Sequence, residues 1–260
     1  MSIPKITHQI WMQGFKNIPD KFKNNVETLH SLNLEYEHKQ WDESMLRDEC
    51  KKYSEECLER FNSLEQMILK VDLGRYVVLY NYGGISVDTD MEQLKPIRTL
   101  PDINSNKFMI SKCAFPYNII GMLNNAVIIT PANNEILEKI IETIINDKRK
   151  ASDFSTKEMH TQYVTGPAFI NNILQNISMP YTIIDNKYFE PCSSDDIFCT
   201  VDKDAIMDHK HDGSWVSSYI NILLKFVIFI IRFSIYIVLA IILVYMFIYK
   251  RGGKKRGKRV

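Results

Sequence analysis

The chain has 260 residues, of which 45% are hydrophobic and 24% charged, so it has enough apolar material to bury one substantial core in one or two domains. Its formal net charge of only +1 excludes a general electrostatic attraction to nucleic acid. The five cysteines lack the close pairs of a metal-binding motif, and we expect them to be mostly buried thiols rather than a disulfide framework or a zinc site.

Short strands and helices alternate along the first 215 residues. Apolar runs and alternating patterns between turn residues predict the following strands: 5–10, 34–41, 85–87, 108–111, 126–130 and 181–185. Helical spacing predicts the following helices: 20–31, 42–61, 63–82, 134–147 and 165–174. Ser63 and Gln66 have the spacing of a capping box for the third helix, which ends at Gly83-Gly84. We therefore expect one α/β domain over residues 1–215.

A long apolar run, residues 226–249, follows a short neck at residues 216–225. As a helix it would extend about 36 Å, enough to cross a hydrocarbon layer of about 30 Å. Arg232 lies near its start, where the long side chain can reach the interface. A buried helix of a soluble core is the alternative, but such helices are rarely apolar on every side. We expect a transmembrane helix, followed by a basic tail at residues 250–260 with seven Lys or Arg.

The orientation of this span stays open. The charges that follow it favour a cytosolic C-terminus and a lumenal body, whereas the N-terminal residues contain no apolar stretch suited to a secretory signal. A tail-anchored protein with a cytosolic body explains the missing signal. A glycan on the Asn176-Ile177-Ser178 sequon would require a lumenal body. We expect an endomembrane of Golgi or ER type in a eukaryotic or viral-host setting, and the basic tail also suits anionic lipid headgroups.

Two carboxylates follow a short apolar run in YGGISVDTD, residues 82–90. Ligands of open α/β sheets collect beyond the carboxyl ends of strands, and strand alternation predicts that Asp88 and Asp90 point the same way. Because two like charges repel at this separation, a divalent cation would stabilise them, and Mg²⁺ and Mn²⁺ prefer oxygen ligands. A solvated turn without a ligand is the alternative.

Asp72 and Arg75 are three residues apart on the preceding helix and so share one of its faces. One interpretation is a surface ion pair, which would contribute little to stability. The other is that this helix packs beside the Gly-Gly strand, so that both side chains reach the pocket of the two carboxylates.

The run DLGRYVVLYNYGGISVDTDMEQLKP, residues 72–96, resembles the glycosyltransferases with a sugar-binding region containing a DXD motif. Their signature combines Asp-x-x-Arg, an apolar helix, Tyr-Gly-Gly-Ile-Tyr-x-Asp-x-Asp and Leu-Lys-Pro. Residues 3–14, 36–44, 165–170 and 209–215 are similar to further segments of that family, so the resemblance covers roughly residues 3–215. The chain looks most like yeast α-mannosyltransferases and inositolphosphorylceramide mannosyltransferases, and more distantly like the large clostridial glucosylating toxins. Ser86 departs from the family's usual Tyr.

The resemblance implies a GT-A fold and a retaining, metal-dependent transfer from a nucleotide sugar. Carried onto this sequence, it implies that Asp72 and Arg75 contact the sugar or ribose of the donor, and that the catalytic pair is Asp88 and Asp90. Asp88 would hydrogen-bond the donor, and Asp90 would ligate Mn²⁺ or Mg²⁺. His211 is the expected third ligand on the metal side, with His209 as its competitor. The remaining expected donor-binding residues are His8, Gln9, Trp11, Asn125, Ser214 and Trp215, with ordinary core packing left open for Trp11 and an acceptor role for Asn125.

The function implied is that of a membrane-anchored retaining hexosyltransferase. It would move a hexose, with mannose favoured, from GDP-mannose or a UDP-hexose to a sphingolipid or glycan acceptor, without a nucleic-acid partner. One alternative is a catalytically inactive, membrane-tethered binder of nucleotide sugars, to which the departure at Ser86 is a small pointer. Another is a nucleotide-sugar hydrolase that uses the same acidic pair with water as the acceptor.

Overall fold

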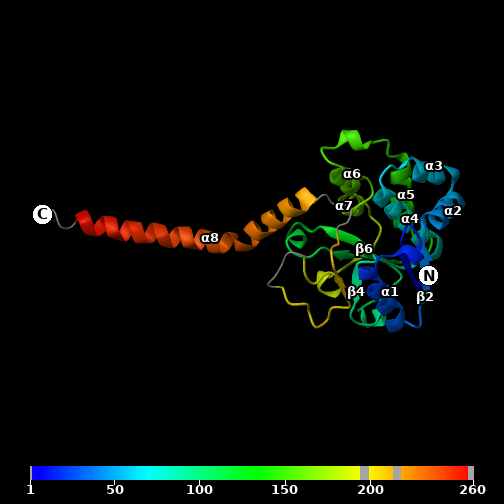
Figure 1. Cartoon of the computed structure of the whole chain (residues 1–260), viewed down its shortest axis with the longest axis horizontal. Helices are drawn as coiled ribbons and strands as arrows, with labels where there is room; N and C mark the ends of the chain where they lie inside the picture. Colours follow the sequence, from blue (N-terminus) through cyan, green and yellow to red (C-terminus); the bar gives the residue numbers. More distant parts are fainter. Residues whose placement is uncertain (1, 194–198, 213–217, 257–260) are drawn as a thin grey trace. The chain divides into compact units, whose positions relative to one another are not determined.

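The computed structural model describes residues 2–193, 199–212 and 218–256. The chain divides into two compact units, residues 1–215 and residues 216–260, which are considered separately (Figure 1). The predicted boundary after residue 215 lies at this division. Ser214 and Trp215, both expected to bind the donor, lie outside the described residues.

The first unit alternates strands and helices. Its strands are β1 Ile6–Ile10, β2 Glu37–Trp41, β3 Gly84–Val87, β4 Met91–Gln93, β5 Phe108–Lys112, β6 Leu123–Thr130, β7 Tyr181–Ile184 and β8 Met207–His209. Its α-helices are α1 Asp20–Leu32, α2 Glu43–Tyr53, α3 Glu55–Ser63, α4 Met67–Tyr82, α5 Glu135–Asn146, α6 Lys157–Val164 and α7 Pro167–Gln175. Short 3₁₀ turns lie at Phe15–Asn17, Ile97–Thr99, Tyr117–Ile120, Ala151–Asp153 and Asn186–Tyr188. The predicted α/β class is confirmed.

A six-stranded mixed sheet organises this unit, in the order β2-β1-β3-β6-β5-β7. β1 runs parallel to both β2 and β3, whereas β6 runs antiparallel to β3 and β5. A separate antiparallel pair joins β4 to β8, which are far apart in the sequence. The carboxyl ends of β1 and β3 therefore meet at one edge of the sheet, where β3 leads into the pair of carboxylates.

The two faces of the sheet bury different clusters. Strand alternation sends Ile128 to the face covered by α4, α5 and α7, whereas Val127 and Ile129 point to the face covered by α1. α4 is enclosed on nearly all sides, with the following side chains fully buried: Leu69, Leu73, Tyr76, Val77, Val78 and Leu79. Polar residues on such a helix must find partners inside the protein.

The Gly83-Gly84 pair lets α4 pass directly into β3. Both glycines have a positive φ, 64° and 100°. A Cβ at Gly83 would lie 2.5 Å from the amide nitrogen of Ala132, and one at Gly84 would lie 2.4 Å from the carbonyl oxygen of Ile6. Because both obstacles are backbone atoms, only glycine allows this close passage, which fixes α4 relative to the strand that ends at Asp88.

Two predicted features of the helices were wrong. The helix expected at residues 42–61 is divided at Ser54, whose hydroxyl accepts from the amide of Cys57 and caps α3. The capping box expected at Ser63 does not form, because Ser63 belongs to the last turn of α3 and donates to the Arg60 carbonyl. α4 begins only after Gln66, whose side chain does not cap the helix.

The cysteines only partly follow the prediction. Cys50, Cys57 and Cys113 are buried thiols, as expected. Cys192 and Cys199, in contrast, form a disulfide, since the fold brings their Cα atoms to 5.8 Å. This disulfide lies next to the site described below.

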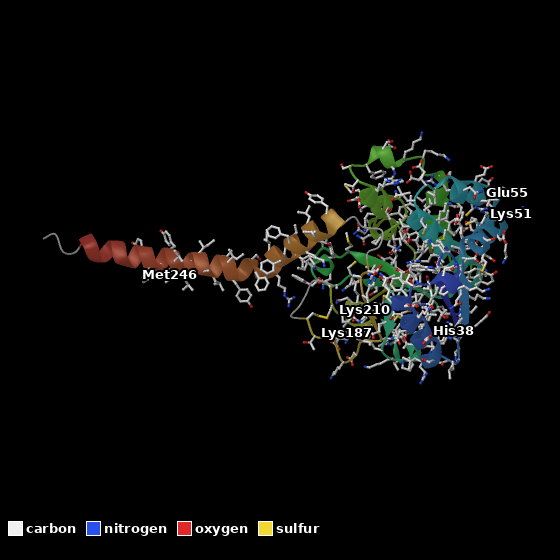
Figure 2. The ribbon with its side chains drawn as sticks, viewed as in Figure 1. His38, Lys51, Glu55, Lys187, Lys210 and Met246 are labelled. Carbon is white, nitrogen blue, oxygen red and sulfur yellow. A yellow bond between two sulfur atoms is a disulfide. The ribbon has the colours of Figure 1, made fainter. Side chains whose placement is uncertain are left out.

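The second unit contains helix α8, Ser218–Arg256. Its side chains are largely exposed, Met246 to 60%, and project from the helix (Figure 2). In the part of the chain that the structure describes, no single helix is long and apolar enough to cross a membrane. The segments Lys225–Ser234 and Tyr236–Phe247, bent by 49° relative to each other, satisfy the criterion together by length and composition.

Candidate active site

The acidic pair lies in the turn between β3 and β4. The amide of Asp88 donates to the Ala126 carbonyl on β6 (3.0 Å), and the amide of Met91 donates back to the Asp88 carbonyl (3.2 Å). From α1, the side-chain amide of Asn25 donates to the Thr89 carbonyl (3.0 Å). The two carboxylates do point toward a common volume, as predicted, with ligand atoms within 4.8 Å of each other. Because both residues follow the end of β3, the cause is the turn and not strand alternation. The turn is instead fixed by bonds to β6 and α1.

Arg75, on helix α4, pairs with the carboxylate of Asp88. Its residue is only 3% exposed, and its guanidinium pairs with Asp88 and donates to the carbonyl of Asn125. Burial alone would lower the pKa of Arg75, but the charges of Asp88 and Asp72 raise it, so the group stays cationic. The alternative of a surface ion pair is therefore wrong, and Arg75 is a buried cation directed at the acidic turn.

Asp72 lies beside this cation without pairing directly with it. Its two carboxylate oxygens accept from the side-chain amide of Asn125 (3.0 Å) and the hydroxyl of Thr165 (2.8 Å). Asn125 also donates to the hydroxyl of Tyr76 (3.1 Å), which in turn donates to the Thr165 carbonyl (2.6 Å). Burial raises the pKa of Asp72 to about 7, opposed by the charge of Arg75. Asp72 and Asn125 thus form a buried network that supports Arg75, and their direct contact with a donor stays a prediction.

Asp88 keeps one side of its carboxylate accessible, with 31% of its side chain exposed. Burial raises the pKa of Asp88, and the nearby charge of Asp90 adds to that effect, while Arg75 opposes both. Arg75 therefore offsets the like-charge repulsion that the sequence predicted for the pair.

Asp90 connects the turn to the end of the first unit. β8 pairs with β4 so that His209 lies opposite Met91. The amide of Lys210 donates to the Asp90 carbonyl (3.0 Å), and the amide of Asp212 donates to the Asp90 carboxylate (3.0 Å). This pairing brings Nε2 of His209 to 3.4 Å from Oδ2 of Asp90.

His209 is the histidine that joins the acidic pair. The ligand atoms of Asp88, Asp90 and His209 all lie within 4.8 Å of one another. His211 stacks on His209 with ring centroids 4.0 Å apart and belongs instead to a second group, with Glu190 and His209. The geometry therefore favours His209, the competitor in the sequence prediction, over His211 as the third residue beside Asp88 and Asp90.

The charges of Asp90, His209 and Glu190 strongly influence one another. Burial alone would raise the pKa of Asp90, but its hydrogen bond and ion pair with His209 lower it to about 2. Burial alone would lower the pKa of His209, yet Asp90 and Glu190 raise it to about 10. Burial, together with the charge of His209, lowers the pKa of His211. Of the two imidazoles, His209 thus carries the positive charge at neutral pH in the metal-free protein.

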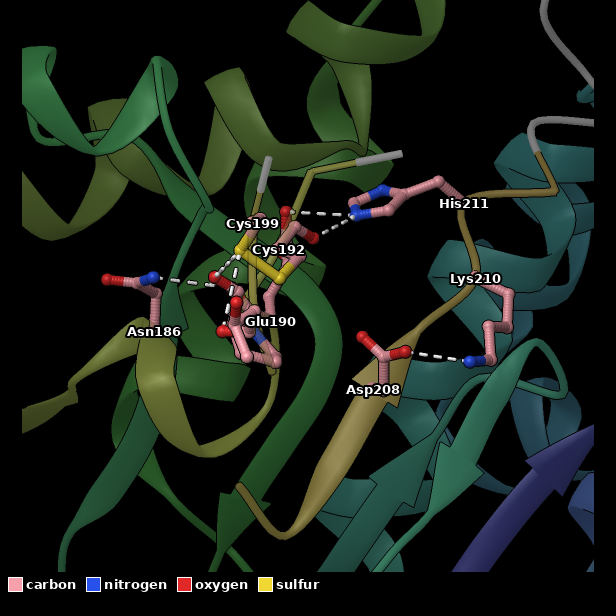
Figure 3. The surroundings of a disulfide bond; sticks show 9 residues. Asn186, Glu190, Cys192, Cys199, Asp208, Lys210 and His211 are labelled. Atoms are coloured by element: carbon pink, nitrogen blue, oxygen red, sulfur yellow. Dashed lines mark hydrogen bonds and ion pairs between the residues drawn. A yellow bond between two sulfur atoms is a disulfide. The ribbon is translucent and has the colours of Figure 1, made fainter. Parts of the chain in front are cut away.

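Glu190 is a residue that the sequence did not identify. It is 4% exposed and accepts from the amide of Ala114 (3.0 Å) and from the side-chain amide of Asn124. His211 faces both its carboxylate, at 3.6 Å, and the carbonyl of Cys192, at 3.3 Å (Figure 3). A single acid in the run Tyr-Phe-Glu-Pro is a weak signal, because only the fold shows that this acid is buried next to two histidines.

Residues on β1 divide between the two faces of the sheet. His8 is buried on the α4 face, where it contacts the Gly83 carbonyl (2.8 Å) and the Trp41 indole (3.1 Å), and burial lowers its pKa to about 4. Both ring nitrogens of His8 therefore contact protein groups, which gives it a place in the core rather than in a donor pocket.

Gln9 and Trp11 lie on the other side of β1. Trp11 packs on Phe22 with ring centroids 5.6 Å apart, so the core interpretation of its ring holds in part. The side-chain amide nitrogen and oxygen of Gln9 and the indole nitrogen of Trp11 are buried. Within the described residues, none of these three atoms has a hydrogen-bond partner. Buried polar atoms without partners are uncommon and indicate positions that a ligand can satisfy.

Residues 19–109, which include α1, α4 and the acidic turn, match the family described as "Glycosyltransferase sugar-binding region containing DXD motif". The predicted resemblance is confirmed over residues 19–109.

Relatives extend the similarity beyond this region. An "Uncharacterized glycosyltransferase L373" of Acanthamoeba polyphaga mimivirus is 27% identical over 223 residues, covering 82% of this chain and 84% of that protein. "Inositol phosphoceramide mannosyltransferase 3" of Schizosaccharomyces pombe is 24% identical over 172 residues, covering 66% of this chain but only 45% of the yeast protein. A solved glycosyltransferase "involved in the glycosylation of the major capsid of PBCV-1" is 15% identical, with a TM-score of 0.44 over 80% of this chain and 94% of that chain.

The side chains of the sugar-binding region and β8 fit a divalent metal ion. Asp88, Asp90 and His209 offer carboxylate oxygens and an imidazole nitrogen within one small volume. Such hard oxygen ligands with one nitrogen suit Mn²⁺ and Mg²⁺. The donor set is therefore compatible with the cofactor that the sequence predicted.

Proposed function

We propose that this chain is a metal-dependent hexosyltransferase that takes a hexose, with mannose favoured, from a nucleotide sugar and transfers it with retention of configuration to a lipid or glycan acceptor. The observation that carries the proposal is the meeting of Asp88, Asp90 and His209 at the carboxyl end of β3, above the buried cation Arg75. Asp88, Asp90 and Arg75 lie within the residues that match the DXD-type sugar-binding family, and His209 comes from β8, outside that match. A GT-A form of the α/β fold is part of this proposal.

The proposed metal would be held by Asp90, Asp88 and His209. When bound, the ion supplies positive charge that stabilises a departing diphosphate more strongly in the transition state than in the ground state. Arg75 contributes by fixing the position of Asp88 and by offsetting part of the negative charge of the turn. Because these groups are positioned before the substrate arrives, little reorganisation is needed during the reaction.

The nucleotide part of the donor would lie at the carboxyl end of β1. The buried amide of Gln9 and the indole N–H of Trp11 support this assignment, since each is available for a hydrogen bond at the edge of the sheet where the acidic turn begins. The proposed contacts of Ser214 and Trp215 with the diphosphate follow from the sequence resemblance. GDP-mannose and a UDP-hexose remain the two donor classes of the proposal.

We further propose that α8 anchors the enzyme to an endomembrane and that the acceptor is a sphingolipid or glycan at that surface. The exposed apolar residues of α8 and the basic tail support the anchor. The name of the yeast relative supports a phosphoinositol-ceramide acceptor. Fractionation with membranes, followed by glycosidase treatment to detect a glycan at Asn176, tests the anchor and its orientation.

The function is tested with the full chain in detergent and a panel of radiolabelled GDP- and UDP-hexoses, with Mn²⁺ or with EDTA. We expect one donor to be consumed with Mn²⁺ and not with EDTA, and the label to appear on a lipid or glycan acceptor. Free labelled hexose as the sole product would instead identify a hydrolase. Donor binding without consumption, with every acceptor tested, would identify an inactive binder, and either result would reject the transferase.

A further inference from the structure

His209 lies between two carboxylates that belong to different parts of the fold. Its Nε2 is 3.4 Å from Oδ2 of Asp90, in the turn after β3. Its Nδ1 is 3.7 Å from Oε2 of Glu190, which follows the 3₁₀ turn Asn186–Tyr188. The two ring nitrogens therefore face different acids, and only the Nε2 side faces the acidic pair proposed to hold a metal.

Glu190 is itself held firmly in place. Its Oε1 accepts from the backbone amide of Ala114 (3.0 Å), and its Oε2 accepts from Nδ2 of Asn124. The Asn124 amide is oriented by its own oxygen, which accepts from the amide of Ala126 (2.8 Å). Nδ2 of Asn124 also lies 3.3 Å from Nδ1 of His209 and can donate to that nitrogen only when Nδ1 carries no proton, so Asn124 and Glu190 favour opposite tautomers of the His209 ring.

The sequence on the C-terminal side of Glu190 adds a second restraint. Cys192, two residues later, is linked to Cys199, and its carbonyl lies 3.3 Å from Nε2 of His211 (Figure 3). His211 in turn stacks on His209 with ring centroids 4.0 Å apart, so Cys192 contacts the imidazole that packs against the His209 ring. Because the Glu190 carboxylate is buried and fixed by hydrogen bonds from Ala114 and Asn124, it is suited to orienting the His209 ring.

We propose that Glu190 is a positioning residue: it accepts the Nδ1–H of His209 and thereby directs Nε2 toward Asp88 and Asp90. Metal-binding histidines commonly donate their other ring N–H to a carboxylate, which fixes the tautomer and makes the ligand nitrogen more basic. Glu190 would thus determine which histidine, and which nitrogen of it, takes part in metal binding. The inference deepens the proposed function and rests on its metal site.

The test measures Mn²⁺ binding directly, by electron paramagnetic resonance of free Mn²⁺, with the full chain in detergent and no sugar donor. Glu190→Gln keeps the shape of the side chain and removes its charge, and Asp90→Asn removes a proposed ligand. Glu92→Gln is the matched control, since Glu92 lies on the adjacent β4 and pairs with Lys210 rather than with a histidine. Thermal unfolding of each variant confirms that it is folded.

We expect Glu190→Gln to raise the Kd for Mn²⁺ by about 10- to 100-fold, with Glu92→Gln within about twofold of the wild type. Binding by Asp90→Asn should be lost. A Kd for Glu190→Gln equal to that of the control, with Asp90→Asn still defective, would overturn the role of Glu190 and leave the metal site standing. A wild type that binds no Mn²⁺ would overturn both.

A second measurement needs no variant. It distinguishes orientation of the His209 ring by Glu190 from a general effect of the negative charge of Glu190 on metal binding. Nitrogen-15 NMR of the histidine rings, with Zn²⁺ as a diamagnetic probe, reports which nitrogen of His209 carries the proton. We expect a protonated Nδ1 and a metal-bound Nε2 in the wild type. A metal-bound Nδ1 with the proton on Nε2 would contradict the proposal, whatever the affinities show.

Discussion

The two carboxylates of the acidic turn lie in surroundings of opposite character. Asp88 faces α4, where Arg75, Asp72 and Asn125 are buried and joined by direct hydrogen bonds of the polar network. Asp90 faces β8, where it accepts from the amide of Asp212 and pairs with His209 at 3.4 Å, and where a second acid, Glu190, lies near the other ring nitrogen. The difference agrees with the proposal that the α4 side positions Asp88 and that Asp90 and His209, on the β8 side, complete the metal site.

Removal of Arg75 is the strongest way to break the α4 side. Arg75→Ala would leave the buried polar network and Asp88 without their cation, and breaking such a pair by removing one partner costs about 3–5 kcal/mol in buried settings. Since Asp88 is partly exposed, we expect a loss near the lower end, about 3 kcal/mol. Urea unfolding measures it. A loss below about 1 kcal/mol would show that the network does not depend on Arg75.

Substitutions on the β8 side should change the affinity for Mn²⁺. We expect His209→Gln to raise the Kd for Mn²⁺ at least about tenfold, equivalent to about 1.4 kcal/mol, because it removes a nitrogen within 4.8 Å of both aspartates. His211→Gln, the matched variant two residues away, should change the Kd by less than about threefold. Titration of both variants with Mn²⁺ shows whether His209 or His211 is the third ligand. A larger effect at His211 would return the third ligand position to the residue expected from the sequence.

The pH dependence of stability tests the charge on the β8 side of the same comparison. Asp90 and Glu190 raise the pKa of His209 to about 10, above its ordinary value of 6.5. A raised pKa means that the folded state holds the proton more tightly, so this stabilisation is fully present below pH 6.5 and is lost as the pH rises toward 10. In the metal-free protein, the difference in unfolding free energy between wild type and His209→Gln should therefore be largest at pH 6.

The measurement is urea unfolding in EDTA at pH 6, 8 and 10, because groups common to both proteins cancel in the difference. We expect the difference to shrink steadily as the pH rises from 6 toward 10. A difference that stays constant over this range would mean that His209 is not held as a cation by the two acids.

The α4 side was largely predictable from the sequence, and the β8 side was not. Asp72, Arg75 and Asp88 lie within one continuous segment, so helical spacing and the Gly-Gly junction offered their meeting as one of two interpretations, and burial in the structure decided it. β4 and β8 have three residues each, too few to show a strand pattern, and their pairing joins distant parts of the chain. The choice of His209 over His211 depends on that pairing, because His209 lies opposite Met91 while His211 continues beyond the strand.

Sequence spacing also could not show which serine caps a helix. Ser63 has Gln66 at capping-box spacing, whereas Ser54 has Cys57 at that position, yet only Ser54 caps a helix. The difference is tertiary, since α3 extends through Ser63 and its hydroxyl bonds within that helix. Glu190 gave no usable signal, because the meaning of a single acid depends on the burial and on the histidines that the fold supplies.

The most direct test of the central claim, that the acidic turn and His209 hold a cation against the phosphates of a sugar nucleotide, is the Mn²⁺-dependent turnover of the preferred donor by wild type and Asp90→Asn. We predict that Asp90→Asn reduces turnover by at least about 100-fold, that added Mn²⁺ does not restore it, and that thermal unfolding shows a folded protein. Turnover by Asp90→Asn equal to that of the wild type, with the same dependence on Mn²⁺, would contradict it.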